Sequence, residues 1–204
     1  MKTLANYIHA RLTEFDQISY HRRHTLEQLG RLITHQIPAQ KHTKIVFVCT
    51  HNSRRSQLAQ AWATTAAFHF AISKLAIISA GTQATEVDRR TIDALGRAGF
   101  TWKCSDNPNP TYTLRINSTG QTISLFSKTL LDSIKDTEDC IALMTCSRAD
   151  RACPTMDGVS NRISLCYDDP KTSNGTCQES DIYDTCCQTI SREMLYAFST
   201  IQRS

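Results

Sequence analysis

The chain has 204 residues, a formal net charge of +4 at pH 7 and nine cysteines. This length suffices for one well-packed domain with residues left for an appendage. The lysines and arginines are spread along the chain, so we expect no nucleic-acid partner. No apolar run approaches about 18 residues, which excludes a membrane-spanning helix, and the N-terminus is not typical of a signal peptide. We therefore expect a cytoplasmic protein without membrane partners, whose cysteines are thiols and not a disulfide framework.

The first 42 residues are separate in pattern from the rest. Residues 3–36 carry apolar side chains at helical spacing and predict two amphipathic helices with a break near Asp16 to Tyr20. Pro38 and the polar residues up to Thr43 then form a linker. We therefore divide the chain into an N-terminal helical extension and linker, residues 1–42, and a catalytic domain, residues 43–204. The helical pair either packs on the domain, which we favour, or forms a dimerisation or lid element.

Residues 44–56 predict a buried strand that runs directly into a phosphate-sized loop. Ile45 to Val48 form an apolar, mostly β-branched run typical of an inner parallel strand, and the spacing from Ser56 to Phe70 predicts a helix. Unpaired N–H groups and the dipole at a helix start favour binding of a tetrahedral oxyanion. The residues that we expect to bind it are Thr50, His51, Asn52, Ser53, Arg54, Arg55 and Ser56.

Cys49 opens this loop, and Arg55 follows six residues later. Hydrogen-bond donors beside the Cys49 thiol favour its thiolate, and the Arg55 guanidinium can donate two hydrogen bonds to the same anion. The pattern predicts a cysteine nucleophile that faces its own substrate. In the alternative interpretation Cys49 is a buried strand-end residue and Arg54 and Arg55 are solvated charges. That alternative places two arginines beside the positive end of a helix dipole without an anion.

The rest of the chain alternates strands and helices. Strands are predicted at 75–79, 140–145 and 163–166, helices at 88–97 and 181–201, and a β-hairpin from 111–116 and 122–126. The alternation predicts an α/β fold with a doubly wound, mostly parallel sheet of about four strands and a site at their carboxyl ends. We expect the hairpin at the sheet edge or as an insertion.

Tyr-Asp-Asp-Pro, residues 167–170, follows the last predicted strand. Its carboxylates should therefore lie at the same end of the sheet as Cys49. The segment is either an ordinary acidic turn or the source of a general acid that protonates a leaving oxygen.

Cys146 and Cys153 lie seven residues apart in a polar segment that begins where the strand at 140–145 ends. The two thiols can reach each other if the segment is locally helical or remodels. Alternatives are a chance spacing in a chain with nine cysteines or an incidental metal site. A metal is disfavoured because the chain has no Cys-x2-Cys pair and its histidines lie elsewhere. We expect no metal and no cofactor.

These motifs together resemble one superfamily. Cys-x5-Arg-Ser after a buried strand is similar to the loop of low-molecular-weight protein tyrosine phosphatases and thioredoxin-coupled arsenate reductases. The string from Phe47 to Trp62 looks closest to the arsenate reductase branch, and the segment from Cys146 to Pro154 resembles the redox segment of that branch. The resemblance covers residues 43–203 and implies a low-molecular-weight phosphatase-like fold.

The resemblance implies an arsenate reductase working by a thiol relay. Cys49 would attack arsenate, held by Arg55 and the loop, and Asp169 would protonate the departing hydroxyl, with Asp168 as the second choice. Cys146 would then displace arsenite from Cys49, and Cys153 would take over the resulting disulfide for reduction by thioredoxin. The main alternative is a phosphatase that hydrolyses phosphate monoesters through a phospho-cysteine. A non-catalytic anion or phosphopeptide binder is a third hypothesis.

Two features depart from the family pattern. His51 stands where both branches usually carry glycine, so if this position requires a positive φ, histidine adopts it less readily. Residues 171–176, Lys-Thr-Ser-Asn-Gly-Thr, follow the Asp-Pro pair where phosphatases of this type often carry aromatic residues. We therefore expect no platform for an aryl phosphate from this loop.

Overall fold

A central sheet of four parallel strands organises the computed structural model, which describes residues 3–37, 43–116, 120–134, 140–152 and 158–202. The strand order is β2-β1-β6-β7. The bounds are β1 Thr43–Cys49, β2 Leu75–Gly81, β6 Cys140–Met144 and β7 Val159–Ser164. β1 pairs with β2 on one side and with β6 on the other, so the predicted motif strand is an inner strand of the sheet. The predicted doubly wound parallel sheet is confirmed.

Alternate residues of β1 face two different cores. Ile45 and Phe47 belong to the larger hydrophobic cluster, whereas Val46 and Val48 belong to the smaller one. Successive side chains of a strand point to opposite faces, so an inner strand covered on both faces needs apolar residues throughout. This explains why the run at 45–48 is continuously apolar.

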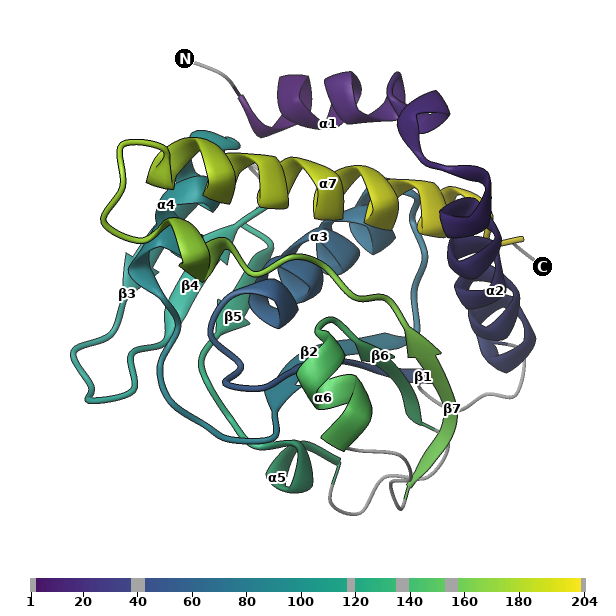
Figure 1. Cartoon of the computed structure of the whole chain (residues 1–204). Coiled ribbons are helices and arrows are strands. Elements are labelled where there is room, and N and C mark those ends of the chain that lie inside the picture. The colour runs from purple at the N-terminus through teal and green to yellow at the C-terminus, as the bar shows by residue number, and fades with distance from the viewer. Residues whose placement is uncertain (1–2, 38–42, 117–119, 135–139, 153–157, 203–204) are drawn as a thin grey trace.

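Helices cover both faces of the sheet (Figure 1). On the side of the larger cluster lie α3 Arg55–His69, α4 Arg89–Arg97 and α7 Glu179–Ser199. On the other side lie the short helices α5 Leu130–Ile134 and α6 Ser147–Ala152. α3 follows β1 directly, so the N-terminal end of α3 meets the carboxyl end of β1.

The predicted hairpin lies in a second, antiparallel sheet. Its strands are β3 Thr101–Cys104, β4 Tyr112–Arg115 and β5 Thr122–Leu125. β3 was not predicted from the sequence, because this short strand is largely exposed and has no apolar alternation. Side chains of α3 attach the sheet: Gln60 Nε2 donates to the Ser124 carbonyl (3.2 Å) and Gln57 Nε2 to the Phe126 carbonyl (3.0 Å). The hairpin is thus an insertion and not an edge of the main sheet.

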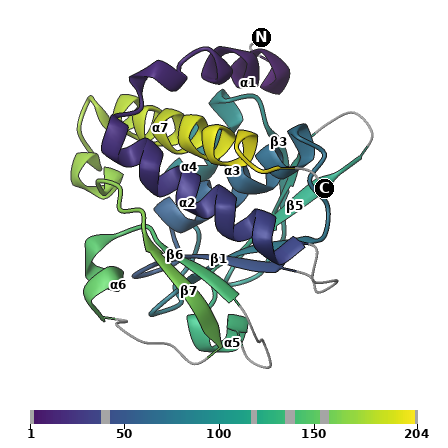
Figure 2. The ribbon, with the colours of Figure 1, turned by 90° about the vertical axis from the view of Figure 1, so that its right-hand side faces the viewer.

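The N-terminal helices pack on the last helix. They are α1 Leu4–Leu12 and α2 Tyr20–Gln36, separated by a 3-10 turn, η1 Phe15–Gln17. Both helices contact α7, and Figure 2 shows α2 running beside it. Tyr7 stacks on the buried Trp62 of α3 with ring centroids 5.2 Å apart. The two helices therefore contribute to the larger hydrophobic cluster.

No helix within the described ranges is long and apolar enough to cross a membrane.

Candidate active site

The loop between β1 and α3 turns its carbonyl groups outward. The carbonyls of Cys49, Thr50 and Ser53 accept hydrogen bonds from the backbone N–H groups of Thr82, Gln83 and Asp88 at 2.9 to 3.2 Å. Within the described ranges, no backbone N–H from Thr50 to Arg54 donates to a protein acceptor. Carbonyls satisfied on the outside and N–H groups left unused are the arrangement that an anion needs. The loop therefore has the donors that the sequence predicted.

Asn52 holds the shape of the loop. Its backbone has a positive φ of 47°, and its side chain is fully buried. The side-chain amide donates to Ser56 Oγ (2.8 Å), while Oδ1 accepts from the backbone N–H of Lys128 (2.9 Å). Asparagine is one of the residues that adopt a positive φ most readily. The strained position is thus Asn52 and not His51, so the histidine that replaces the usual glycine carries no such cost.

The Cys49 thiol is buried at the bottom of the loop, 3.1 Å from the Ser56 hydroxyl. Ser56 Oγ already accepts a hydrogen bond from Asn52, so its own hydrogen is available for the Cys49 sulfur. A hydroxyl donor directed at the sulfur stabilises negative charge there. Ser56 is therefore placed to stabilise a thiolate at Cys49, the predicted nucleophile.

Gly81 at the end of β2 allows the loop to pack closely. A Cβ atom there would lie 2.7 Å from the Asn52 nitrogen and 2.9 Å from the Thr50 oxygen, closer than real side chains come. The turn at Ala80-Gly81-Thr82 therefore requires glycine at its centre, because only glycine leaves room for the loop beside β2.

Asp169 lies against two consecutive arginines of the loop. Arg54 Nε is 2.9 Å from Asp169 Oδ1, and Arg55 Nη2 is 2.8 Å from Oδ2. Arg55 Nη1 also donates to the Tyr167 carbonyl (2.9 Å), while its Nε is a buried donor without a partner in the described ranges. Asp168 is exposed. The preferred acid therefore lies at the loop, and Arg55 retains one donor that an oxyanion can use.

Burial raises the pKa of Asp169, but the positive charge of Arg55 and the hydrogen bond from Arg54 outweigh it, so the net pKa lies below its ordinary value. In this arrangement the carboxylate is ionised at neutral pH. A role as acid therefore requires that a bound substrate change its surroundings.

Arg54 is also held by a polar network, formed with Asp88 and Tyr183, that the sequence did not predict. Arg54 Nη1 lies 3.4 Å from Asp88 Oδ2, and the Tyr183 hydroxyl lies 3.2 Å from the same oxygen. Asp88 Oδ1 caps α4 by accepting from the Arg90 N–H (3.0 Å). Burial, followed by the charge of Asp88, raises the pKa of Tyr183, so the hydroxyl stays neutral. Asp88 carried only a helix-start signal in the sequence, and Tyr183 only a helical apolar position.

Cys146 is the second thiol beside the loop. Its Sγ is buried, lies 3.4 Å from Thr50 Oγ1 and accepts from the backbone N–H of Ala149 (3.4 Å) at the start of α6. Thr50 is the neighbour of Cys49 in the chain, so the structure brings the two predicted thiols to the same end of the sheet. Cys153 lies outside the described residues.

The remaining described cysteines offer no reactive alternative in the core. Burial is the main cause that raises the pKa of Cys140 to about 11 and those of Cys186 and Cys187 to about 12. Such thiols stay protonated and are poor nucleophiles. Cys140 and Cys187 are small core residues, and Cys186 packs partly buried against the larger cluster. Cys104 and Cys177 are exposed and Cys166 is partly buried.

Cationic side chains surround the loop. Burial and then the charges of Arg54, Lys171 and Arg148 lower the pKa of His51, with Asp169 acting in the opposite direction. The lowered pKa keeps His51 neutral at pH 7, while the cations attract an anionic substrate. Within the described ranges, no group of three or more His, Cys, Asp or Glu side chains has an arrangement that could hold a metal ion.

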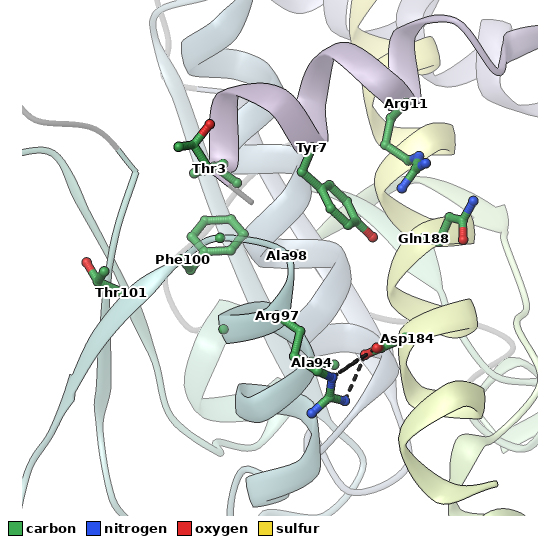
Figure 3. A pocket seen from close by; sticks show the side chains of 13 residues that line it. Thr3, Tyr7, Arg11, Ala94, Arg97, Ala98, Phe100, Thr101, Asp184 and Gln188 are labelled. Carbon is green, nitrogen blue, oxygen red and sulfur yellow. Dashed lines mark hydrogen bonds and ion pairs between the residues drawn. The ribbon is translucent and has the colours of Figure 1, made fainter. Parts of the chain in front are cut away.

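A separate cleft of about 830 Å³ lies between α1, α4 and α7 (Figure 3). Tyr7 and Arg11 line one side and Arg97 and Asp184 the other. Arg97 and Asp184 pair with each other at 2.7 Å. None of the loop residues from Cys49 to Ser56 lines this cleft, so it is distinct from the anion loop.

Comparisons with known proteins identify the family of this chain. The family model described as low molecular weight phosphotyrosine protein phosphatase matches residues 44–110. An arsenate reductase from Bacillus cereus (strain G9842) is 31% identical over 126 residues, 62% of this chain and 75% of that protein. A second, from Bacillus cereus (strain ATCC 14579), is 29% identical over the same shares.

Among solved structures, a YwlE mutant from Bacillus subtilis has a TM-score of 0.55 at 17% identity and covers 77% of this chain and 97% of that one. This likeness concerns the fold alone. Together with the sequence matches, it shows that the chain belongs to the low-molecular-weight phosphotyrosine protein phosphatase superfamily, which includes these arsenate reductases.

Proposed function

We propose that this protein reduces arsenate to arsenite with Cys49 as the nucleophile and with Cys146 and Cys153 as a thiol relay, regenerated by a dithiol protein such as thioredoxin. The observation that carries the proposal is the position of Cys146, whose Sγ lies 3.4 Å from Thr50 Oγ1 at the mouth of the loop. A hydrolase that resolves its intermediate with water has no need of a second thiol at this place. The similarity to proteins named arsenate reductase supports the same choice.

In the first step the loop binds arsenate. The unused N–H groups from Thr50 to Arg54 and the buried Nε of Arg55 supply the donors. The Cys49 thiolate then attacks arsenic, an As–S bond forms and one As–O bond breaks. Asp169 gives its proton to the departing hydroxyl of the arsenate, which leaves as water.

Substrate binding prepares Asp169 for this transfer. The anion adds a negative charge near the carboxylate and draws the Arg55 guanidinium, now 2.8 Å from Asp169 Oδ2, toward itself. Loss of an opposite charge and gain of a like charge both increase the proton affinity of a carboxylate. Asp169 is therefore ionised in the resting arrangement and protonated in the complex.

In the second step the Cys146 thiolate attacks the Cys49 sulfur. A disulfide forms between the two cysteines, and the electron pair of the As–S bond stays on arsenic, which leaves as arsenite. The two thiols supply the two electrons. Cys153 then attacks Cys146, releasing the Cys49 thiolate and forming a Cys146–Cys153 disulfide, which the external dithiol reduces.

The main alternative is a phosphatase in which water hydrolyses a phospho-cysteine at Cys49. It shares the loop, Arg55 and Asp169, and the family model favours it equally. It leaves the position of Cys146 without a function.

The test is turnover of arsenate against an aryl phosphate, with and without thioredoxin, thioredoxin reductase and NADPH. We expect catalytic arsenite formation only when the complete reducing system is present, because each turnover oxidises two thiols of the enzyme. Hydrolysis of the aryl phosphate without any arsenite formation would contradict the proposal and select the phosphatase. Anion binding without turnover of either substrate would select a binding protein.

A further inference from the structure

The N-terminal helix α2 reaches the chain segment that carries Asp169. Arg22, in the first turn of α2, donates from Nη2 to the Cys166 carbonyl at 3.3 Å. Its guanidinium carbon lies 4.7 Å from the centre of the Tyr167 ring, a distance at which a cation and an aromatic face attract. Arg22 Nε is fixed by Glu193 Oε1 of α7 at 2.9 Å. One side chain of the extension thus contacts both residues that precede the Asp168–Asp169 pair.

Arg55 holds the same segment from the side of the catalytic loop. Its Nη1 donates to the Tyr167 carbonyl (2.9 Å) and its Nη2 to Asp169. Two arginines from distant parts of the chain therefore hold consecutive carbonyl groups, Arg22 that of Cys166 and Arg55 that of Tyr167.

The contact of Arg22 is well shielded from solvent. Its side chain is 21% exposed and that of Glu193 is 7% exposed. Low exposure strengthens a charged interaction, and a planar guanidinium can stack on a ring while it donates hydrogen bonds from its edge. When substrate draws Arg55 toward the anion, Arg22 remains as the fixed support of the segment, because Glu193 and not the substrate anchors it.

We infer that Arg22 is a positioning residue for Asp169 and that the N-terminal helices serve the reaction through this contact. The inference rests on the proposed role of Asp169 as the acid. It assigns a catalytic purpose to the extension, beyond its packing on α7.

The test compares Arg22→Lys with Tyr196→Phe. Lysine keeps a positive charge near Glu193 but cannot stack on Tyr167 and hold the Cys166 carbonyl at once. Tyr196→Phe is the matched control, because it removes another hydrogen bond between α7 and α2, from the Tyr196 hydroxyl to Glu27 (2.7 Å), that does not touch the acid segment.

The first readout is hydrogen exchange and does not depend on activity. The backbone N–H of Tyr167 donates to the Thr145 carbonyl at 3.2 Å and reports on how firmly the segment is held. We expect Arg22→Lys to speed exchange at Tyr167 by about tenfold, because local opening becomes easier, and Tyr196→Phe to leave it unchanged.

The second readout is the kinetics of arsenate reduction. We expect Arg22→Lys to lower kcat by about tenfold with KM changed less than about twofold, since the acid is displaced while the anion loop is intact. Because a displaced acid contributes less, the decline of kcat at alkaline pH should become shallower. The charged and titratable groups that interact with Asp169 include Arg54, Arg55 and His51, and all three are the same in both variants.

Unchanged Tyr167 exchange and kcat in Arg22→Lys would overturn the inference, as would equal losses in Tyr196→Phe, which would indicate general loosening of the extension. If Arg22→Lys folds poorly, the double variant Arg22→Gln, Glu193→Gln removes both buried charges and should show the same two effects. Absence of arsenite formation by the unaltered chain would refute the proposed function, whereas the exchange experiment would still decide on the contact.

Discussion

Arg54 forms a close ion pair with Asp169, the proposed acid: Arg54 Nε lies 2.9 Å from Asp169 Oδ1. Arg54 is one of the residues that the sequence predicted to bind the oxyanion. The other carboxylate oxygen, Oδ2, is occupied by Arg55. Arg54 Nη2 also donates to Oδ2 at 3.4 Å, so Arg54 contacts both carboxylate oxygens and Arg55 contacts one. Arg54 also pairs with Asp88, so under the proposed mechanism it would keep Asp169 at the loop when Arg55 turns to the substrate.

This ion pair makes the stability of the protein depend on pH. The pKa of Asp169 is lowered in the folded protein, so its contribution is fully present above the unfolded pKa of about 3.9 and is lost as pH falls through the folded pKa. We expect Arg54→Gln to destabilise the protein at neutral pH and to reduce the loss of stability below about pH 4. Urea unfolding between pH 2 and 7 measures both effects.

The control for this prediction is Arg89→Gln. Arg89 pairs with Asp93 at 2.8 Å on the surface, where ion pairs contribute little. The free energy of unfolding of Arg89→Gln should therefore change with pH as that of the unaltered protein does. A profile of Arg54→Gln that also follows the unaltered protein would show that the Arg54–Asp169 pair does not contribute to acid sensitivity.

Cys49→Ser should abolish every activity and retain oxyanion binding. The backbone donors and Arg55 remain in this variant, but the thiolate is gone. Product formation and calorimetric titration with phosphate measure the two properties. Cys177→Ser is the matched control. It replaces an exposed thiol that has no part in the proposed reaction, so this variant should keep full activity. Appreciable turnover by Cys49→Ser would rule out Cys49 as the nucleophile.

Much of this site follows from local sequence pattern, and the remainder does not. The strand that ends at Cys49 is encoded by a continuous apolar run and the next helix by apolar residues at helical spacing, so the loop between them was predictable. The network of Arg54, Asp88 and Tyr183 was not, because its members lie 34 and 129 residues apart along the chain and polar contacts leave no periodic signal. The contact of Arg22 with Cys166 could not be predicted from the sequence for the same reason.

The backbone of the loop shows a second limit of sequence reasoning. The family pattern drew attention to His51 as the position where a positive φ would be strained. The positive φ belongs to its neighbour Asn52, whose buried amide also fixes the loop through Ser56 and Lys128. Residue type alone does not tell which of two adjacent positions takes the left-handed conformation.

Asp169→Asn should slow the step in which the leaving oxygen takes up a proton by about a hundredfold, the usual contribution of a positioned acid. Asparagine has nearly the same shape but no proton to give. Asp168→Asn is the adjacent control and should matter much less, because Asp168 is exposed while Asp169 lies against Arg54 and Arg55. Single-turnover kinetics of adduct formation measure the step. A larger effect from Asp168→Asn would reverse the roles of the pair.

The two enzyme hypotheses differ only at the relay thiols. They share Cys49, Arg55 and Asp169, so substitutions there do not separate them. In a phosphatase, water resolves the intermediate, and replacing Cys146 or Cys153 by serine should leave ester hydrolysis near that of the unaltered chain. In a reductase, arsenic must leave with two electrons, which only a second thiol attacking the Cys49 adduct supplies.

The two serine variants should therefore fail at different stages of arsenate reduction. Cys146→Ser should release no arsenite by the internal relay, because the thiol beside Thr50 is absent. Cys153→Ser should complete about one turnover and then accumulate a Cys49–Cys146 disulfide, since no third thiol is available to displace Cys49. Arsenite released per enzyme and disulfide mapping by mass spectrometry distinguish the two stages. Repeated thioredoxin-dependent reduction by both variants would exclude the relay through Cys146 and Cys153.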